Sequence, residues 1–142
     1  QDHYTPSQPG IQRMVLRLED LMRRIDKDMD DHFQKEGVGY MQFSFRWMNC
    51  ILLREMPMHA IIRLWDTYFS EEGSGFERFH TYVCCAILQT YRETLMNANF
   101  QDMLLFLQDM PTSEWGEQEV EVVLSQAFIL SSLYEGSPSH LL

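Results

Sequence analysis

Apolar residues recur at steps of three and four along most of the chain, which is the spacing of one face of a helix. The clearest run consists of Ile11, Met14, Val15, Leu18, Leu21, Met22, Ile25, Met29 and Phe33. We therefore predict one long helix over about residues 10–35, which Gly37 and Gly39 would end.

The same spacing, together with the residues that interrupt it, predicts five further helices. We expect them at about residues 40–56, 57–70, 76–96, 99–110 and 117–135. Pro57 suits the first turn of a helix, and Asn97 or Asn99 is suited to cap the helix at about 99–110. No segment alternates like a strand, so the predicted fold is all-α, with about six helices and short connections.

The helix expected at about residues 40–56 is apolar around most of its circumference. Only Gln42, Arg46 and Asn49 form a polar stripe on it. A helix of this kind is typical of the middle of a fold.

The chain of 142 residues has the length of a single domain. We expect an extended leader at residues 1–10, a helical body at 11–135 and a loose tail at 136–142. The chain starts with Gln1 instead of Met, which suggests a piece of a longer protein. Such a piece should expose an apolar seam, on the first helix or on the one at 40–56, and should tend to self-associate.

Charge is unevenly distributed along the sequence. Residues 1–92 hold all 11 Lys and Arg and 13 of the 21 acidic residues, whereas residues 93–142 hold eight acidic residues and no Lys or Arg. Nucleic acids and anionic membranes are therefore disfavoured as partners, because both require a basic surface. No apolar run is long enough to span a bilayer, and no signal peptide is present. A protein partner with a basic or mixed surface remains compatible with this charge.

The three cysteines, Cys50, Cys84 and Cys85, lack the spacing of a disulfide framework, which favours reduced thiols and a cytoplasmic location. His80 and Cys84 are one helical turn apart, but nothing nearby supplies the other two ligands of a zinc site. A packed histidine and buried cysteines are the more common situation. We expect no metal and no other cofactor.

Three aspartates, Asp26, Asp28 and Asp30, resemble the start of a calcium loop. Asp31 and Gly37 occupy the positions where such a loop needs a glycine and a bidentate glutamate. The simpler interpretation is an acidic, solvated helix end.

A basic stripe follows one side of the first predicted helix and consists of Arg13, Arg17, Arg24 and Lys27. It could meet an acidic partner surface, or it could be an ordinary solvated face.

Several arginines stand beside large aromatic residues within apolar segments, where a charge is costly to bury unless it is paired. We expect Arg46 or Arg63 to bind Asp66 or Glu55. The pair would then either tie central helices together or offer an arginine to a phosphate or a partner carboxylate. Neutral substitution would unfold the domain in the first case and weaken only binding in the second.

These motifs resemble the C-terminal half of the TBC domain, the GTPase-activating module for Rab GTPases. The matching strings are Tyr40-Met41-Gln42-Phe43-Ser44-Phe45-Arg46-Trp47, Arg54-Glu55 and Arg63-Leu64-Trp65-Asp66-Thr67-Tyr68. The resemblance covers nearly the whole chain and is closest to the Golgi-associated branch of the family. It implies an all-helical subdomain preceded by a catalytic one, located in the cytoplasm at Golgi or endosomal membranes.

The resemblance also implies roles for particular residues. The family's catalysis uses a donated arginine and a donated glutamine, from an I-x-x-D-x-x-R segment and a Y-x-Q segment followed by glycine. Here Asp31 stands at the arginine position, and Phe43 stands at the glycine position after Gln42. We therefore expect no catalytic residue in this chain. The motif residues that are either structural or partner-facing are Phe43, Phe45, Arg46, Trp47, Arg54, Glu55, Arg63, Leu64, Trp65 and Asp66.

The sequence thus predicts part of a GTPase activator whose partner is a GTP-bound Rab GTPase, engaged through the complete domain. In this interpretation the chain supports the catalytic subdomain, lines part of the Rab groove and is inactive alone. The alternative is a free-standing helical module for protein interaction or scaffolding. The lack of an internal repeat disfavours a solenoid.

Overall fold

The computed structural model describes residues 7–50, 52, 54–69 and 75–136, and the regular structure within this part of the chain is entirely helical. The helices are α1 (Ser7–Ile25), α2 (Lys27–Glu36), α3 (Tyr40–Asn49), α4 (Met58–Phe69), α5 (Gly75–Thr90), α6 (Arg92–Met96), α7 (Phe100–Gln108) and α8 (Glu117–Ser131), and a π-helical turn, η2 (Ser132–Gly136), continues α8. The all-α prediction is confirmed, although the described residues form eight α-helices where we expected about six.

The prediction of one helix over residues 10–35 is wrong, because α1 and α2 are separate helices that meet at Asp26. The Asp26 backbone is not helical (φ −148°, ψ 80°), and its Oδ1 accepts a hydrogen bond of 3.2 Å from the Met29 N–H. An aspartate in this position caps a new helix. Its carboxylate also binds the Arg92 guanidinium, at 2.6 and 3.1 Å, which joins the break to α6.

The first helix begins at Ser7, inside the segment predicted as an extended leader. Pro9 lies in the first turn of α1, where a helix needs no N–H group from it. Residues 1–6 and 137–142 lie outside the described residues, so a leader and a loose tail there stay predictions.

The helix predicted over residues 40–56 ends earlier, because α3 stops at Asn49. Leu52 has a left-handed backbone (φ 65°) and a fully buried side chain, and its N–H donates to the Trp47 carbonyl at 3.1 Å. We call residues 50–57 the α3–α4 connector; residues 50, 52 and 54–57 of it are described.

The helix predicted over residues 76–96 is also interrupted, at Tyr91, so that α5 and the short α6 follow each other. The predicted cap of the following helix is confirmed for Asn99, whose side chain accepts from the Asp102 N–H at 2.9 Å. That helix, α7, ends at Gln108, ahead of Pro111.

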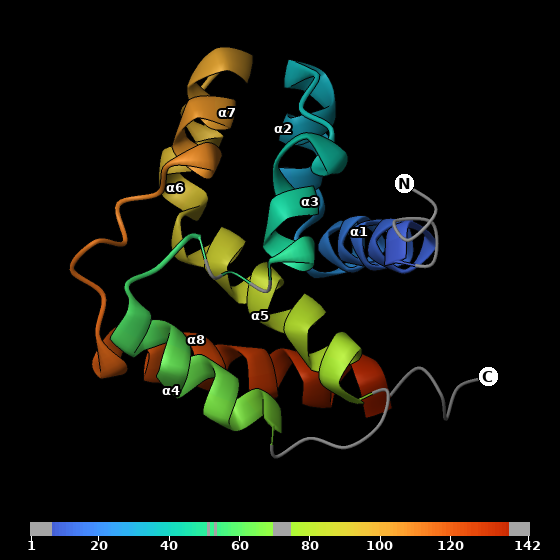
Figure 1. Cartoon of the computed structure of the whole chain (residues 1–142). Coiled ribbons are helices and arrows are strands. Elements are labelled where there is room, and N and C mark those ends of the chain that lie inside the picture. The colour runs from blue at the N-terminus through green and yellow to red at the C-terminus, as the bar shows by residue number, and fades with distance from the viewer. Residues whose placement is uncertain (1–6, 51, 53, 70–74, 137–142) are drawn as a thin grey trace.

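The helix in the middle of the fold is α5, which crosses between the α4–α8 layer and the helices above it (Figure 1). Residues 79–88 are all buried, and α5 packs against α1, α4 and α8. The expectation that α3 would be central is therefore only partly met. It buries Phe43 and Trp47 on one face, but its other face leaves Met41 and Phe45 exposed.

Candidate functional site

Exposure divides the ten motif residues into three groups. The buried ones are Phe43, Trp47, Glu55 and Leu64. The half-buried ones are Arg46, Arg63 and Trp65, and the exposed ones are Phe45, Arg54 and Asp66. The first group belongs to the core, so only the second and third groups can contact a partner.

Arg46 joins three segments of the fold. Its Nε donates to Glu55 Oε2 at 2.7 Å and its Nη2 to Glu55 Oε1 at 3.3 Å, which makes a bidentate pair. Nη2 also donates to the Gln108 carbonyl at the end of α7, at 2.8 Å. The hydrogen bond to Glu55 raises the pKa of Arg46. The predicted pairing of Arg46 with Glu55 is confirmed, and it ties α3 to the α3–α4 connector and to α7.

Arg63 pairs with a residue that no motif indicated. Its Nε donates to Glu121 Oε2 of α8 at 2.6 Å, and its Nη1 donates to Thr67 Oγ1 at 2.7 Å. Asp66 is exposed and forms no ion pair within the described part of the chain. Arg63 therefore joins α4 to α8, while Asp66 points to solvent.

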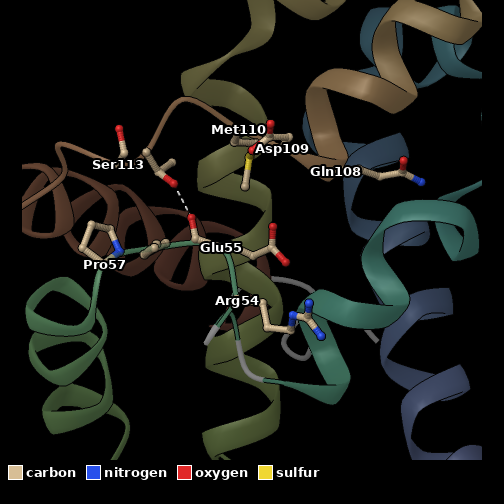
Figure 2. A pocket seen from close by; sticks show the side chains of 9 residues that line it. Arg54, Glu55, Pro57, Gln108, Asp109, Met110 and Ser113 are labelled. Carbon is tan, nitrogen blue, oxygen red and sulfur yellow. Dashed lines mark hydrogen bonds between the residues drawn. The ribbon is translucent and has the colours of Figure 1, made fainter.

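A pocket of about 400 Å³ lies between the α3–α4 connector and the chain that leaves α7 (Figure 2). Arg54, Glu55, Met56 and Pro57 line it from the connector. The residues that line it from the other side are Gln108, Asp109, Met110, Thr112 and Ser113. No sequence motif pointed to this second group, in which Gln108 ends α7 and the other residues follow it in an irregular segment.

The walls of this pocket are held together by hydrogen bonds. The Thr112 hydroxyl donates to the Glu55 carbonyl, as the dashed line in Figure 2 shows. The Glu55 N–H in turn donates to the Leu52 carbonyl at 2.9 Å. Together with the Arg46–Glu55 pair, these bonds fix the connector against the segment after α7.

A second pocket, of about 540 Å³, adjoins the first, because Gln108 lines both. Its other lining residues come from α3 and are Met41, Gln42, Phe43, Phe45 and Arg46. We call the two pockets together the α3–α7 face. It gathers the exposed motif residues Phe45 and Arg54 with the half-buried Arg46.

His80 is a packed histidine, as the simpler interpretation predicted. It is fully buried, and its Nε2 lies 3.0 Å from the Trp47 carbonyl. Because a carbonyl only accepts, Nε2 carries the proton, and Nδ1 accepts from the Tyr68 hydroxyl. Burial lowers the pKa of His80 to about 4.

The neighbouring cysteines are buried, and the Cys84 sulfur lies 3.8 Å from His80 Nε2. Burial raises the pKa of the Cys84 and Cys85 thiols, which keeps them protonated and unreactive. Within the described residues, no group of three His, Cys, Asp or Glu side chains is placed to hold a metal ion.

Part of the basic stripe on the first helices is paired locally. Arg24 binds Asp20 at 3.3 Å, and Lys27 binds Asp31 at 3.0 Å, both on the surface. Arg17 lies over the Tyr82 ring, 6.0 Å from its centroid. The two ion pairs are typical of a solvated helix face, whereas Arg17 is half-buried and packs against the buried Tyr82.

Gln42 and Asp31, which stand at the positions compared with the family's catalytic segments, make local contacts within the fold. Gln42 Oε1 accepts from the Gly39 N–H at 2.7 Å, so this side chain caps the start of α3. Asp31, at the position where the family pattern has arginine, is the exposed partner of Lys27.

The fold and these motifs agree with the comparisons to known proteins. Residues 1–96 match the family described as the Rab-GTPase-TBC domain. The chain belongs to this TBC family. It is 50% identical over 141 residues to the GTPase-activating protein gyp1 of Schizosaccharomyces pombe, covering 99% of this chain and 27% of that protein. It is 46% identical over 141 residues to human TBC1 domain family member 22B, covering 99% of this chain and 28% of that protein.

A solved structure supports the same TBC assignment. The crystal structure of the Ypt/Rab-GAP domain of Gyp1p superposes with a TM-score of 0.86 at 50% identity, over 90% of this chain and 39% of that one. The chain thus spans about a quarter of the length of the two relatives named above. None of the helices in the described residues is long and apolar enough to cross a membrane.

Proposed function

We propose that this chain is the C-terminal part of a GTPase-activating protein for Rab GTPases. In this proposal it supports the catalytic subdomain of a longer protein and contributes the α3–α7 face to the groove that receives GTP-bound Rab. Membership of the TBC family supports it, as do the name of the Schizosaccharomyces pombe relative, a GTPase-activating protein, and the similar crystal structure, which is that of a Ypt/Rab-GAP domain. By the same family resemblance, the protein acts at Golgi or endosomal membranes.

The observation that carries the proposal is that the side chains of Gln42 and Asp31 make local contacts within this chain. A glutamine that orients the attacking water must point its amide at the nucleotide. The Gln42 amide oxygen instead caps α3, and Asp31 offers no positive charge to a phosphate. We infer that the arginine and the glutamine that accelerate hydrolysis come from other parts of the longer protein.

Single-turnover GTP hydrolysis tests this division of roles. A panel of Rab GTPases would be assayed with the 142-residue chain alone and with the longer protein that contains it. Because a donated arginine contributes roughly 10³–10⁵ in rate, the chain alone should leave the intrinsic rate unchanged while the longer protein accelerates it. Stimulation by the isolated chain that matches the longer protein would overturn the proposal.

A variant of Gln42 provides the matched control. In the longer protein, Gln42→Ala should keep kcat at saturating Rab GTPase within about twofold, because the Gln42 side chain caps α3 and takes no part in the chemical step. Gln42 also lines the α3–α7 face, so any weakening of Rab binding should raise KM instead. A loss of several hundredfold would mean that Gln42 is itself the catalytic glutamine.

A further inference from the structure

Among the residues that the structure describes, Arg54 differs from most arginines in having no carboxylate partner. Within the described residues, carboxylates pair with Arg23, Arg24, Arg46, Arg63 and Arg92. Arg54 is exposed at the edge of the 400 Å³ pocket and pairs with no carboxylate in the part of the chain that the structure describes, although acidic residues outnumber basic ones by 21 to 11 in the sequence. Its guanidinium is therefore available to a carboxylate from outside.

The backbone that carries Arg54 is rigidly held. Leu52, two residues before it, has a left-handed backbone that costs a residue with a β-carbon roughly 1–2 kcal/mol. Burial of the Leu52 side chain and the hydrogen bond from the Glu55 N–H offset this strain. On the other side of Arg54, Arg46 and Thr112 hold Glu55 at its carboxylate and at its carbonyl. These contacts at Leu52 and Glu55 position the backbone near Arg54, which lowers the entropic cost of binding through this residue.

The pocket beside Arg54 has a mixed character. Met56 and Met110 are 8% and 7% exposed and provide an apolar floor, while Ser113 and Gln108 provide a polar rim. Methionine adapts its shape to an incoming apolar side chain. A nucleotide is disfavoured here, because among the described residues that line the pocket Arg54 is the one basic side chain, and it stands beside the carboxylates of Glu55 and Asp109.

We propose that Arg54 and this pocket dock the GTPase itself. The Arg54 guanidinium binds a carboxylate on the GTPase surface, and an apolar side chain next to that carboxylate enters the pocket between Pro57 and Met110. This inference rests on the proposed function. It names the residues of this chain that contact the GTPase. It also states the kind of GTPase surface that they select, namely an acidic residue beside an apolar one.

The test is the GTP hydrolysis assay with the longer protein and a Rab GTPase that it stimulates. Arg54→Glu should lower kcat/KM about tenfold through KM, with kcat within about twofold, because a charge at an interface governs association more than chemistry. The matched control is Arg13→Glu, which makes the same charge change at another exposed arginine that lines a separate pocket. It should leave KM unchanged.

Two further variants separate charge from shape. Arg54→Lys keeps the charge but not the forked geometry of the guanidinium, so its KM should lie between those of wild type and Arg54→Glu. Added salt should reduce the difference in KM between wild type and Arg54→Glu, because it screens the charge. Ser113→Trp fills the pocket from an exposed position without changing charge, and it should raise KM as well. Substituting surface acidic residues of the GTPase by lysine, one at a time, should identify one that rescues Arg54→Glu.

The outcomes distinguish this inference from the function on which it rests. If the wild-type longer protein stimulates no Rab GTPase, the proposed function fails. If it stimulates one and Arg54→Glu behaves like Arg13→Glu, only the docking role of Arg54 is refuted. A lower kcat or melting temperature at unchanged KM would also refute it, because Arg54 would then contact another part of its own protein.

Discussion

The bidentate pair between Arg46 and Glu55 allows the sharpest prediction about stability. The Glu55 side chain is 2% exposed, whereas that of Arg46 is 37% exposed. Arg46→Met removes both hydrogen bonds to the carboxylate and the one to the Gln108 carbonyl. It leaves a charged group buried without a partner, which is the most costly way to break such a pair.

The size of the effect follows from the exposure of the two side chains. Removing one partner of a fully buried pair costs about 3–5 kcal/mol. Because more than a third of Arg46 faces water, solvent will reach part of the Glu55 carboxylate in the variant, so we expect a loss of about 2–3 kcal/mol. For 142 residues the unfolding entropy is roughly 0.3 kcal/mol per kelvin, so Tm should fall by about 7–10 °C.

The assay is urea and thermal unfolding of a double-mutant cycle. The variant Arg46→Met with Glu55→Met removes both charges and should regain most of the lost stability. Arg24→Met, which breaks the exposed pair with Asp20, should cost less than about 0.5 kcal/mol. The reasoning is refuted if Arg46→Met is as mild as Arg24→Met, or if the double variant is no more stable than Arg46→Met alone.

Two further predictions concern pH. The pKa of His80 in the folded chain is about 4, below its ordinary 6.5. As pH falls, the unfolded chain therefore binds the proton before the folded chain does. The free energy of unfolding should decrease between pH 6.5 and 4 by up to about 3 kcal/mol. In urea titrations across that range, His80→Gln should be less stable at pH 7 but show a shallower slope, and an unchanged slope would contradict the assignment. Burial raises the pKa of Asp26, but the hydrogen bonds from Arg92 and from the Met29 N–H lower it by more, so its net pKa is below the ordinary 3.8. Asp26→Ala should therefore lower the free energy of unfolding by about 1–2 kcal/mol at pH 7 through the lost helix cap, and by less below pH 3.8. Thermal unfolding at pH 7 and pH 3, with Asp20→Ala as the control, measures this difference. If Asp26→Ala were equally destabilising at both pH values, the ionised cap would be unimportant.

The sequence by itself was sufficient for the features that depend on neighbouring residues. Spacing of three and four predicted the helical class, and the residues that interrupt it located most connections. Asn97 or Asn99 was predicted as a cap, because the side chain of such a residue bonds to a backbone group a few residues later, and the structure has Asn99 in this role. The aromatic–arginine motifs indicated the TBC family, which the comparisons confirmed.

Only the tertiary structure decided which surfaces meet. The break at Asp26 is stabilised by Arg92, 66 residues later, and the partner of Arg63 is Glu121, 58 residues later. The pocket beside Arg54 likewise needs residues 108–113, which carry no motif. Periodicity states which face of a helix is apolar, but it does not state which other face covers it, because that choice depends on how all the helices pack at once. For this reason the family could be named from the sequence, whereas the α3–α7 face could be found only in the folded chain.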